Sequence, residues 1–161
     1  MNHFPFIFLC ILALAFMTFS VKGQNNNFVD PSGIYEYDGE TVNKDGETYG
    51  YFGTIKVLRL DSNQILVSFY ICKGAPSYNS GSFVNTLEYS NNRAIYRGDT
   101  TEPLSTCRLI FNFNREGIWT ELFSDNINGA CGFGHAVDAE GFYKKVKGKL
   151  PTKEEILESE N

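Results

Sequence analysis

The sequence predicts an all-β protein, a single antiparallel up-and-down barrel of about eight strands. Short runs rich in β-branched and aromatic residues recur along the chain, clusters of turn-forming residues separate them, and no long helical pattern interrupts them. Hairpin connections throughout favour a meander, and closing the meander into a barrel removes its unpaired edge strands. A sandwich of two sheets is the alternative.

The expected strands follow one another at short, fairly regular intervals. They cover Gly33–Tyr37, Tyr51–Leu60, Gln64–Ile71, Ser82–Tyr89, Arg93–Arg97, Thr106–Phe113, Gly117–Phe123 and Ala139–Val146. Turn residues join them at Asp61–Asn63, Asn91-Asn92 and Asn114–Gly117. Asn and Asp suit such turns because they tolerate left-handed backbone or cap it with their side chains.

Alternation along two strands indicates which side chains face the core. One set is Ile65, Val67, Phe69 and Ile71, and the other is Cys107, Leu109, Phe111 and Phe113. A slip of one residue would turn either set towards solvent, so the register of these strands should be well fixed.

The N-terminus indicates export. The apolar run from Phe6 to Phe19 is too short to span a bilayer and has the length of a signal-peptide core. We expect residues 1–23 to be a signal peptide cleaved after Gly23, with Ser20 as a second cleavage site. Lipidation at Cys10 and an uncleaved membrane anchor are the alternatives. Cleavage removes 23 of the 161 residues and leaves 138, enough for one domain with its own core.

The remaining chain divides into three parts. We expect a flexible lead-in over residues 24–32, the barrel domain over residues 33–147 and a polar, acidic tail over residues 148–161. Within the tail, Thr152-Lys153-Glu154-Glu155 has the pattern of a helix capping box. The tail should therefore carry a short, weakly held helix or be disordered.

Charge narrows the classes of partner. The net charge is −5, and loss of Lys22 with the signal peptide would make it −6. A negative domain without a basic stripe argues against binding to nucleic acid or to anionic lipid. We expect a protein partner, with a weak preference for a basic one, and no membrane span after the signal peptide is removed.

The cysteines predict one disulfide. Cys72, Cys107 and Cys131 remain after cleavage, and an oxidising compartment permits one bridge among them. Cys107 should face inward and Cys72 outward, and opposed faces make a bridge between these two difficult. We therefore predict a Cys107–Cys131 disulfide and a free Cys72.

The chain has no Asn-X-Ser/Thr sequon, which favours a bacterial periplasm or cell exterior over a eukaryotic secretory route.

Little in the sequence points to an enzyme. After cleavage His135 is the single histidine, which excludes metal sites built on two histidines and limits any Ser-His-Asp triad to this residue. Cys131 could act as a nucleophile paired with His135 only if its thiol were free, and a disulfide is the favoured state of Cys131. The carboxylates that could hydrolyse a glycoside are Glu121, Asp125, Asp138 and Glu140, but each fits an outward strand or loop position better. We expect no catalytic residues and no cofactor.

The sequence Asp-Gly-Glu-Thr occurs twice in the long first connection, at Asp38–Thr41 and Asp45–Thr48. Two turns in a solvated loop are the simpler interpretation. A calcium loop is the alternative, because closely spaced oxygens suit a hard cation, but the ligand spacing of an EF-hand is absent. We expect no metal site.

Two groups of residues are candidates for binding. Tyr49, Tyr51 and Tyr78 lie at strand ends or in loops, where exposed tyrosines suit a binding surface. Gly132, Phe133 and His135 lie in a glycine-rich turn next to Cys131. A disulfide would hold this turn rigid, either as structure or as a preorganised contact surface, with Phe133 closing the end of the barrel.

The segment Cys131–Lys145 resembles the C-terminal signature of a family of small, largely uncharacterised exported bacterial proteins, C-G-F-G-x-x-V-x-A-x-G-x-Y-K-K. Gly33-Ile34-Tyr35, Arg93–Tyr96 and Cys107-Arg108-Leu109 are similar to its earlier motifs, as is the hairpin from Val57 to Phe69. The resemblance implies export and a calycin-like or lipocalin-like β-barrel, similar in plan to periplasmic lysozyme inhibitors. Cys72 and the acidic tail depart from the family pattern.

The expected function is that of a secreted or periplasmic, non-enzymatic binding protein that engages a hydrolase or another envelope component. A small-ligand carrier using the barrel interior is the alternative, and a small hydrolase is less favoured. Large residues at many predicted inward positions leave little room for a ligand, which favours protein binding.

Overall fold

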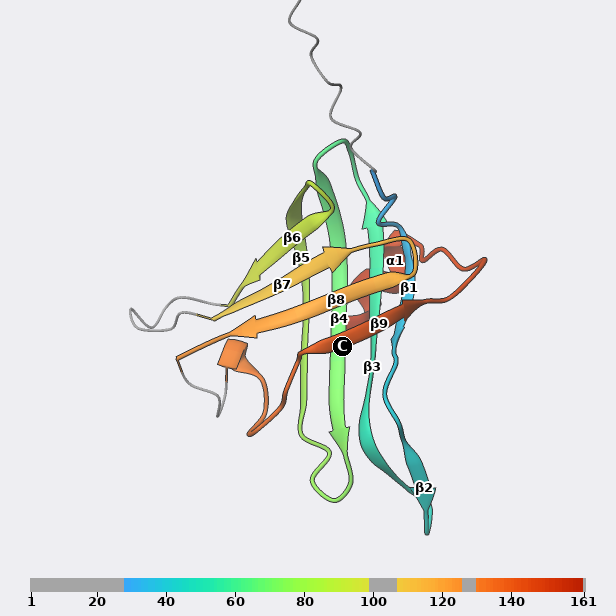
Figure 1. Cartoon of the computed structure of the whole chain (residues 1–161), viewed down its shortest axis with the longest axis vertical. Coiled ribbons are helices and arrows are strands. Elements are labelled where there is room, and N and C mark those ends of the chain that lie inside the picture. Colours follow the sequence, from blue (N-terminus) through green and yellow to red (C-terminus); the bar gives the residue numbers. More distant parts are fainter. Residues whose placement is uncertain (1–27, 99–106, 126–129, 161) are drawn as a thin grey trace, which may run out of the picture.

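The computed structural model describes residues 28–98, 107–125 and 130–160. The predicted signal peptide and its cleavage sites lie outside these ranges. Figure 1 shows an antiparallel sheet that curls around a single core. Within the described ranges, no helix has the length and apolar character needed to cross a membrane.

In the described ranges, nine strands form this sheet. They are β1 (Gly33–Tyr37), β2 (Val42–Lys44), β3 (Glu47–Arg59), β4 (Gln64–Gly74), β5 (Ser80–Ser90), β6 (Arg93–Arg97), β7 (Arg108–Phe113), β8 (Gly117–Phe123) and β9 (Gly141–Lys145). The short helices are η1 (Ala130–Gly132), α1 (Lys153–Leu157) and η2 (Glu158–Glu160).

The sheet closes into a barrel. Its order is β1-β9-β8-β7-β6-β5-β4-β3-β2, and β1 also pairs with β3. Tyr35 in β1 lies opposite Lys145 in β9 and opposite Ile55 in β3, so β1 closes the seam between them. The result is an eight-stranded antiparallel barrel, as predicted, and not a two-sheet sandwich. The strand β2 is an addition to the predicted set.

The first connection differs from the expected loop. Its middle forms β2, which pairs with the first part of β3, while β1 pairs with the second part of the same strand. Asp45 and Gly46 make the two-residue turn between β2 and β3, with φ angles of 54° and 81° that suit a type I′ hairpin. A register shift between Tyr49 and Phe52 interrupts the pairing of β3 with β4.

Side chains stabilise the other turns in the expected way. Asn91 and Asn92 both adopt left-handed backbone between β5 and β6, with φ of 52° and 58°. Between β3 and β4, Asp61 Oδ1 accepts hydrogen bonds from the backbone N–H groups of Asn63 and Gln64, both at 2.8 Å. Asn114 Oδ1 accepts the same kind of pair between β7 and β8.

Large side chains fill the barrel interior, as the alternation predicts. Ile65, Val67, Phe69 and Ile71 of β4 are all buried, as are Leu109, Phe111 and Phe113 of β7. Aromatic rings form the centre: Phe69 lies 5.4 Å from Phe83, 6.1 Å from Phe111 and 5.9 Å from Tyr143, measured between ring centroids. The barrel therefore has a packed core.

Both segments that flank the barrel pack onto it. In the expected lead-in, the backbone of Val29 bonds to Asn92 and to the Tyr89 hydroxyl, and Pro31 is buried. In the tail, Thr152 and Glu155 form both bonds of the predicted capping box, and α1 packs on β3 and β4. Ile156 is fully buried, and Leu66 and Ser68, which alternate away from the interior, are buried as well.

Candidate functional site

The binding residues predicted from the sequence gather at one end of the barrel. This end comprises the start of β3, the β4–β5 connection, the end of β8 and residues 131–140, which lead from η1 to β9 and which we call the barrel-end segment. We call the six predicted residues the barrel-end site: Tyr49, Tyr51, Tyr78, Gly132, Phe133 and His135. They differ in exposure and in contacts, so they have different roles.

The predicted disulfide anchors the barrel-end segment. Cys107, just before β7, is bonded to Cys131 in η1, with Cα atoms 5.2 Å apart, and Cys72 is free. Cys72 is nevertheless buried, on the face of β4 opposite to Ile71. Cys131 and Gly132 have left-handed φ angles of 60° and 75°, which turn the chain back over the end of the barrel.

Phe133 closes the barrel and is not a surface residue. Its side chain is buried, and its ring stacks on Phe69 at 5.7 Å between centroids. Gly81 in β5 makes room for it, because a Cβ there would lie 2.3 Å from the Phe133 ring. The expected plug is confirmed, and its burial removes Phe133 from the accessible binding residues.

Four hydrogen bonds hold the residues that follow Phe133 against the barrel. Gly134 N–H donates to Ser80 O at 2.8 Å, and Asn79 Nδ2 donates to His135 O at 2.8 Å. The Tyr51 hydroxyl donates to Ala136 O at 3.1 Å and accepts from Asp138 N–H at 3.3 Å. Tyr51 is therefore a positioning residue, whereas the His135 side chain and Gly132 remain exposed.

Tyr49 and Tyr78 form the exposed aromatic part of the barrel-end site. Their side chains are 40% and 41% accessible. The Tyr78 hydroxyl accepts from Thr48 N–H at 3.1 Å, which fixes Tyr78 beside the start of β3. The Tyr49 hydroxyl donates to Glu47 at 3.1 Å, and this bond and the Glu47 charge raise the pKa of Tyr49. Both rings are thus held in place while their faces stay accessible.

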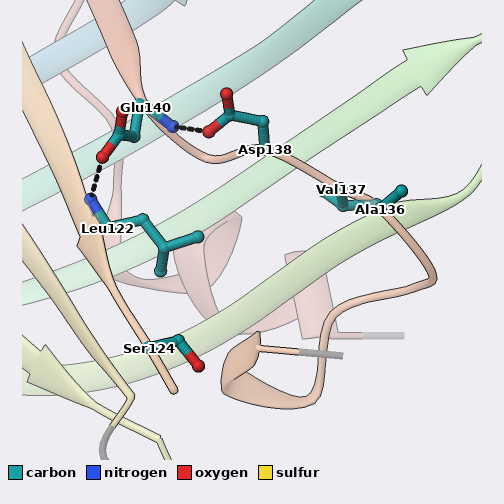
Figure 2. Close-up of a pocket in the computed structure, with 6 residues that line it drawn as sticks. All are labelled: Leu122, Ser124, Ala136, Val137, Asp138 and Glu140. Carbon is teal, nitrogen blue, oxygen red and sulfur yellow. Dashed lines mark hydrogen bonds between the residues drawn. The ribbon is translucent and has the colours of Figure 1, made fainter. Parts of the chain in front are cut away.

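A hollow of about 270 Å³ adjoins the barrel-end segment (Figure 2). Its lining residues are Leu122, Ser124, Ala136, Val137, Asp138 and Glu140. Asp138 Oδ1 accepts from Glu140 N–H at 2.9 Å, and Glu140 Oε1 accepts from Leu122 N–H at 3.1 Å. These bonds give both carboxylates a structural role in shaping the segment.

The other two candidate carboxylates are placed elsewhere. Glu121 lies on the outer face of β8 and accepts from Asn112 Nδ2 at 2.8 Å, while Asp125 is exposed beyond the end of β8. Within the described ranges, no three His, Cys, Asp or Glu side chains come together as metal ligands. The two Asp-Gly-Glu-Thr segments flank β2, and the second one makes its hairpin turn.

Tyr143 is buried beneath this end of the barrel. Its hydroxyl has no hydrogen-bond partner among the described residues, and burial raises its pKa well above the usual value. A buried polar group without a partner costs about 1–3 kcal/mol. Tyr143→Phe should therefore raise the free energy of unfolding by about 1 kcal/mol, measured by urea denaturation. A loss of similar size would show that the hydroxyl makes a stabilising bond.

Sequence patterns single out Tyr51 as a binding candidate, but they reveal neither its positioning role nor that of Asn79. Asn79 binds a carbonyl 56 residues away, and Tyr51 binds one 85 residues away. Neither residue has a local signal beyond its position near a turn.

Comparison with family models, with curated proteins and with solved structures finds no match for this chain.

Proposed function

We propose that this chain is an exported, non-enzymatic binding protein that contacts a protein partner through the barrel-end site. The observation that carries the proposal is the packed interior. Carriers of small ligands keep space inside the barrel, whereas Phe69, Phe111 and Tyr143 fill the centre of this one. Binding then depends on the outer surface.

The barrel-end site has the properties of a preorganised contact surface. Tyr49 and Tyr78 supply large rings with polar tips, the type of residue that is enriched in binding hot spots. The disulfide and the hydrogen bonds of Gly134 and Asn79 hold the neighbouring segment in place. A surface ordered before binding loses less entropy when the partner docks.

The disulfide also supports export. Disulfides persist in secreted and periplasmic proteins and are rare where glutathione and thioredoxin keep thiols reduced. The proposed compartment is the periplasm or the cell exterior, where the partner would be a hydrolase or another envelope component. The hydrolase alternative for this chain itself has less support, since Asp138 and Glu140 are engaged by backbone N–H groups.

The test compares two double variants in quantitative capture from the envelope fraction of the source organism. Tyr49→Ala/Tyr78→Ala should weaken capture of the partner about thirtyfold, because truncating hot-spot residues costs about 2 kcal/mol or more. Phe28→Ala/Tyr70→Ala is the control, since it removes two other exposed aromatic rings. Equal capture by both variants would refute the proposed surface, and saturable uptake of an apolar fluorescent probe into the interior would favour the carrier alternative.

A further inference from the structure

A second surface lies along β9 and extends towards the other end of the barrel. It is an open groove of about 820 Å³ between β9 with residues 146–150 on one side and the β7–β8 turn on the other. In Figure 1 the chain leaves β9 at the right, turns there and returns behind the barrel to α1. The barrel-end site contributes no residue to this groove, so the two surfaces are separate.

The groove concentrates positive charge in an acidic chain. Its five basic residues are Arg115, Lys144, Lys145, Lys147 and Lys149, and its three acidic ones are Asp30, Asp38 and Glu116. The groove thus has a net charge of +2, whereas the whole chain has −5. We call it the lysine groove.

Three of these lysines present their charge to solvent. The side chains of Lys144, Lys147 and Lys149 are exposed. Lys145 differs, because it donates to Asp30 O at 3.3 Å and lies 5.5 Å from the centre of the Tyr35 ring. Flexible, exposed ammonium groups attract carboxylates without fixing one bidentate geometry.

Apolar side chains accompany these charges. Leu150 in the groove is 71% exposed, and Phe142 also lines it. Trp119 lies next to Phe142, 5.0 Å between ring centroids, and is 54% exposed. Exposed aromatic and aliphatic groups beside a charged rim are the usual composition of a protein interface.

We propose that the lysine groove binds an acidic polypeptide segment whose apolar side chains pack on Leu150, Phe142 and Trp119. The positive charge of the groove favours a negatively charged ligand. The exposed apolar side chains favour a polypeptide, which carries apolar side chains of its own, over a polyanion that is polar throughout. The net charge of the chain favours a basic partner, but the groove favours an acidic one. The charge of the groove decides, because a docked segment is affected mainly by charges within about 10 Å and more distant charges are largely screened.

Tryptophan fluorescence can follow occupation of the groove, because Trp119 is the single tryptophan of the chain. The probe is a short synthetic peptide that combines glutamates with leucines, and the same peptide with glutamine in place of glutamate is its neutral counterpart. The acidic peptide should change Trp119 emission in a saturable way at low ionic strength. Added salt should weaken its binding, and the neutral peptide should bind much less tightly.

Matched variants locate the binding. Lys144→Gln/Lys147→Gln/Lys149→Gln should bind the acidic peptide about tenfold more weakly, since each exposed charge contributes a factor of about two to three. Lys44→Gln/Lys73→Gln/Lys153→Gln changes the net charge equally and should bind within about twofold of the unaltered chain. Thermal unfolding of both variants checks that they are folded.

Three results with the peptides and variants would overturn the proposal, and a fourth comes from other polyanions. The three are no saturable change with the acidic peptide, an equal loss of affinity in both triple variants, and equal binding of the neutral peptide. Equally tight binding of a sulfated glycan or of single-stranded DNA with the same number of charges would also overturn it, because the groove would then select charge alone. None of these results depends on Tyr49 or Tyr78, so the outcome is independent of the barrel-end test.

Discussion

Replacing Phe69 by alanine is expected to lower the free energy of unfolding by about 3–5 kcal/mol. Phe69 is buried at the centre of the barrel, and its ring contacts Phe83, Phe111, Phe133 and Tyr143. Truncation removes at once the ring contacts that Phe69 makes with β5, β7, β9 and the barrel-end segment. Urea denaturation followed by circular dichroism measures the effect, and an unchanged m value would show that the unfolded state is unaffected.

The neighbouring residue is a matched control. Tyr70 is also aromatic and lies on the same strand, but its side chain points outward and is 39% exposed. Tyr70→Ala should cost less than about 1 kcal/mol, the range of most surface substitutions. Similar losses in the two variants would contradict the assignment of inner and outer faces in β4.

Removing the disulfide is expected to lower the free energy of unfolding by about 3 kcal/mol, the chain-entropy value for a loop of this length. The bridge closes a separation of 24 residues. The variant is Cys107→Ser/Cys131→Ser, measured by denaturant unfolding. Hydrogen exchange at Gly134 N–H and Asp138 N–H should also become faster. These amides donate to Ser80 O and to the Tyr51 hydroxyl, and both bonds should open more often when the disulfide no longer anchors the segment.

Reducing agent supplies the control for this prediction. It should destabilise the unaltered chain by the same amount and leave the double variant unchanged. Cys72→Ser should respond to reductant like the unaltered chain, because Cys72 is free. Loss of the reductant effect in Cys72→Ser would mean that Cys72 takes part in a bridge in solution.

Strand positions were largely predictable because local patterns determine them. β1, β6 and β8 have the expected bounds, and the asparagine and aspartate turns occur where their chemistry favours them. The start of β3 was not predictable. Gly50 has a φ of 95° and lies where the β3–β4 register shifts, so the alternation that marks a strand is broken there. β2 was missed with it, because it pairs only with this irregular part of β3.

The candidate surfaces were predictable only in part, because their geometry depends on contacts distant in sequence. The predicted tyrosines and the glycine-rich turn meet at one end of the barrel, as barrel closure requires. The burial of Phe133 depends on Phe69 and Gly81, which belong to other strands. The expectation of no basic stripe was wrong, because residues 144–149 supply four of the five basic residues of the lysine groove and only Arg115 comes from the distant β7–β8 turn.

The pairing of β1 with β9 has a consequence for the order of folding. The first and last strands of the barrel meet at Tyr35 and Lys145, so the seam cannot form until nearly the whole chain has emerged. Until then the edges of β1 and β8 are unpaired and open to intermolecular pairing. Such distant contacts also slow folding. Under the export that we propose, the barrel would therefore close only after β9 arrives on the far side of the membrane.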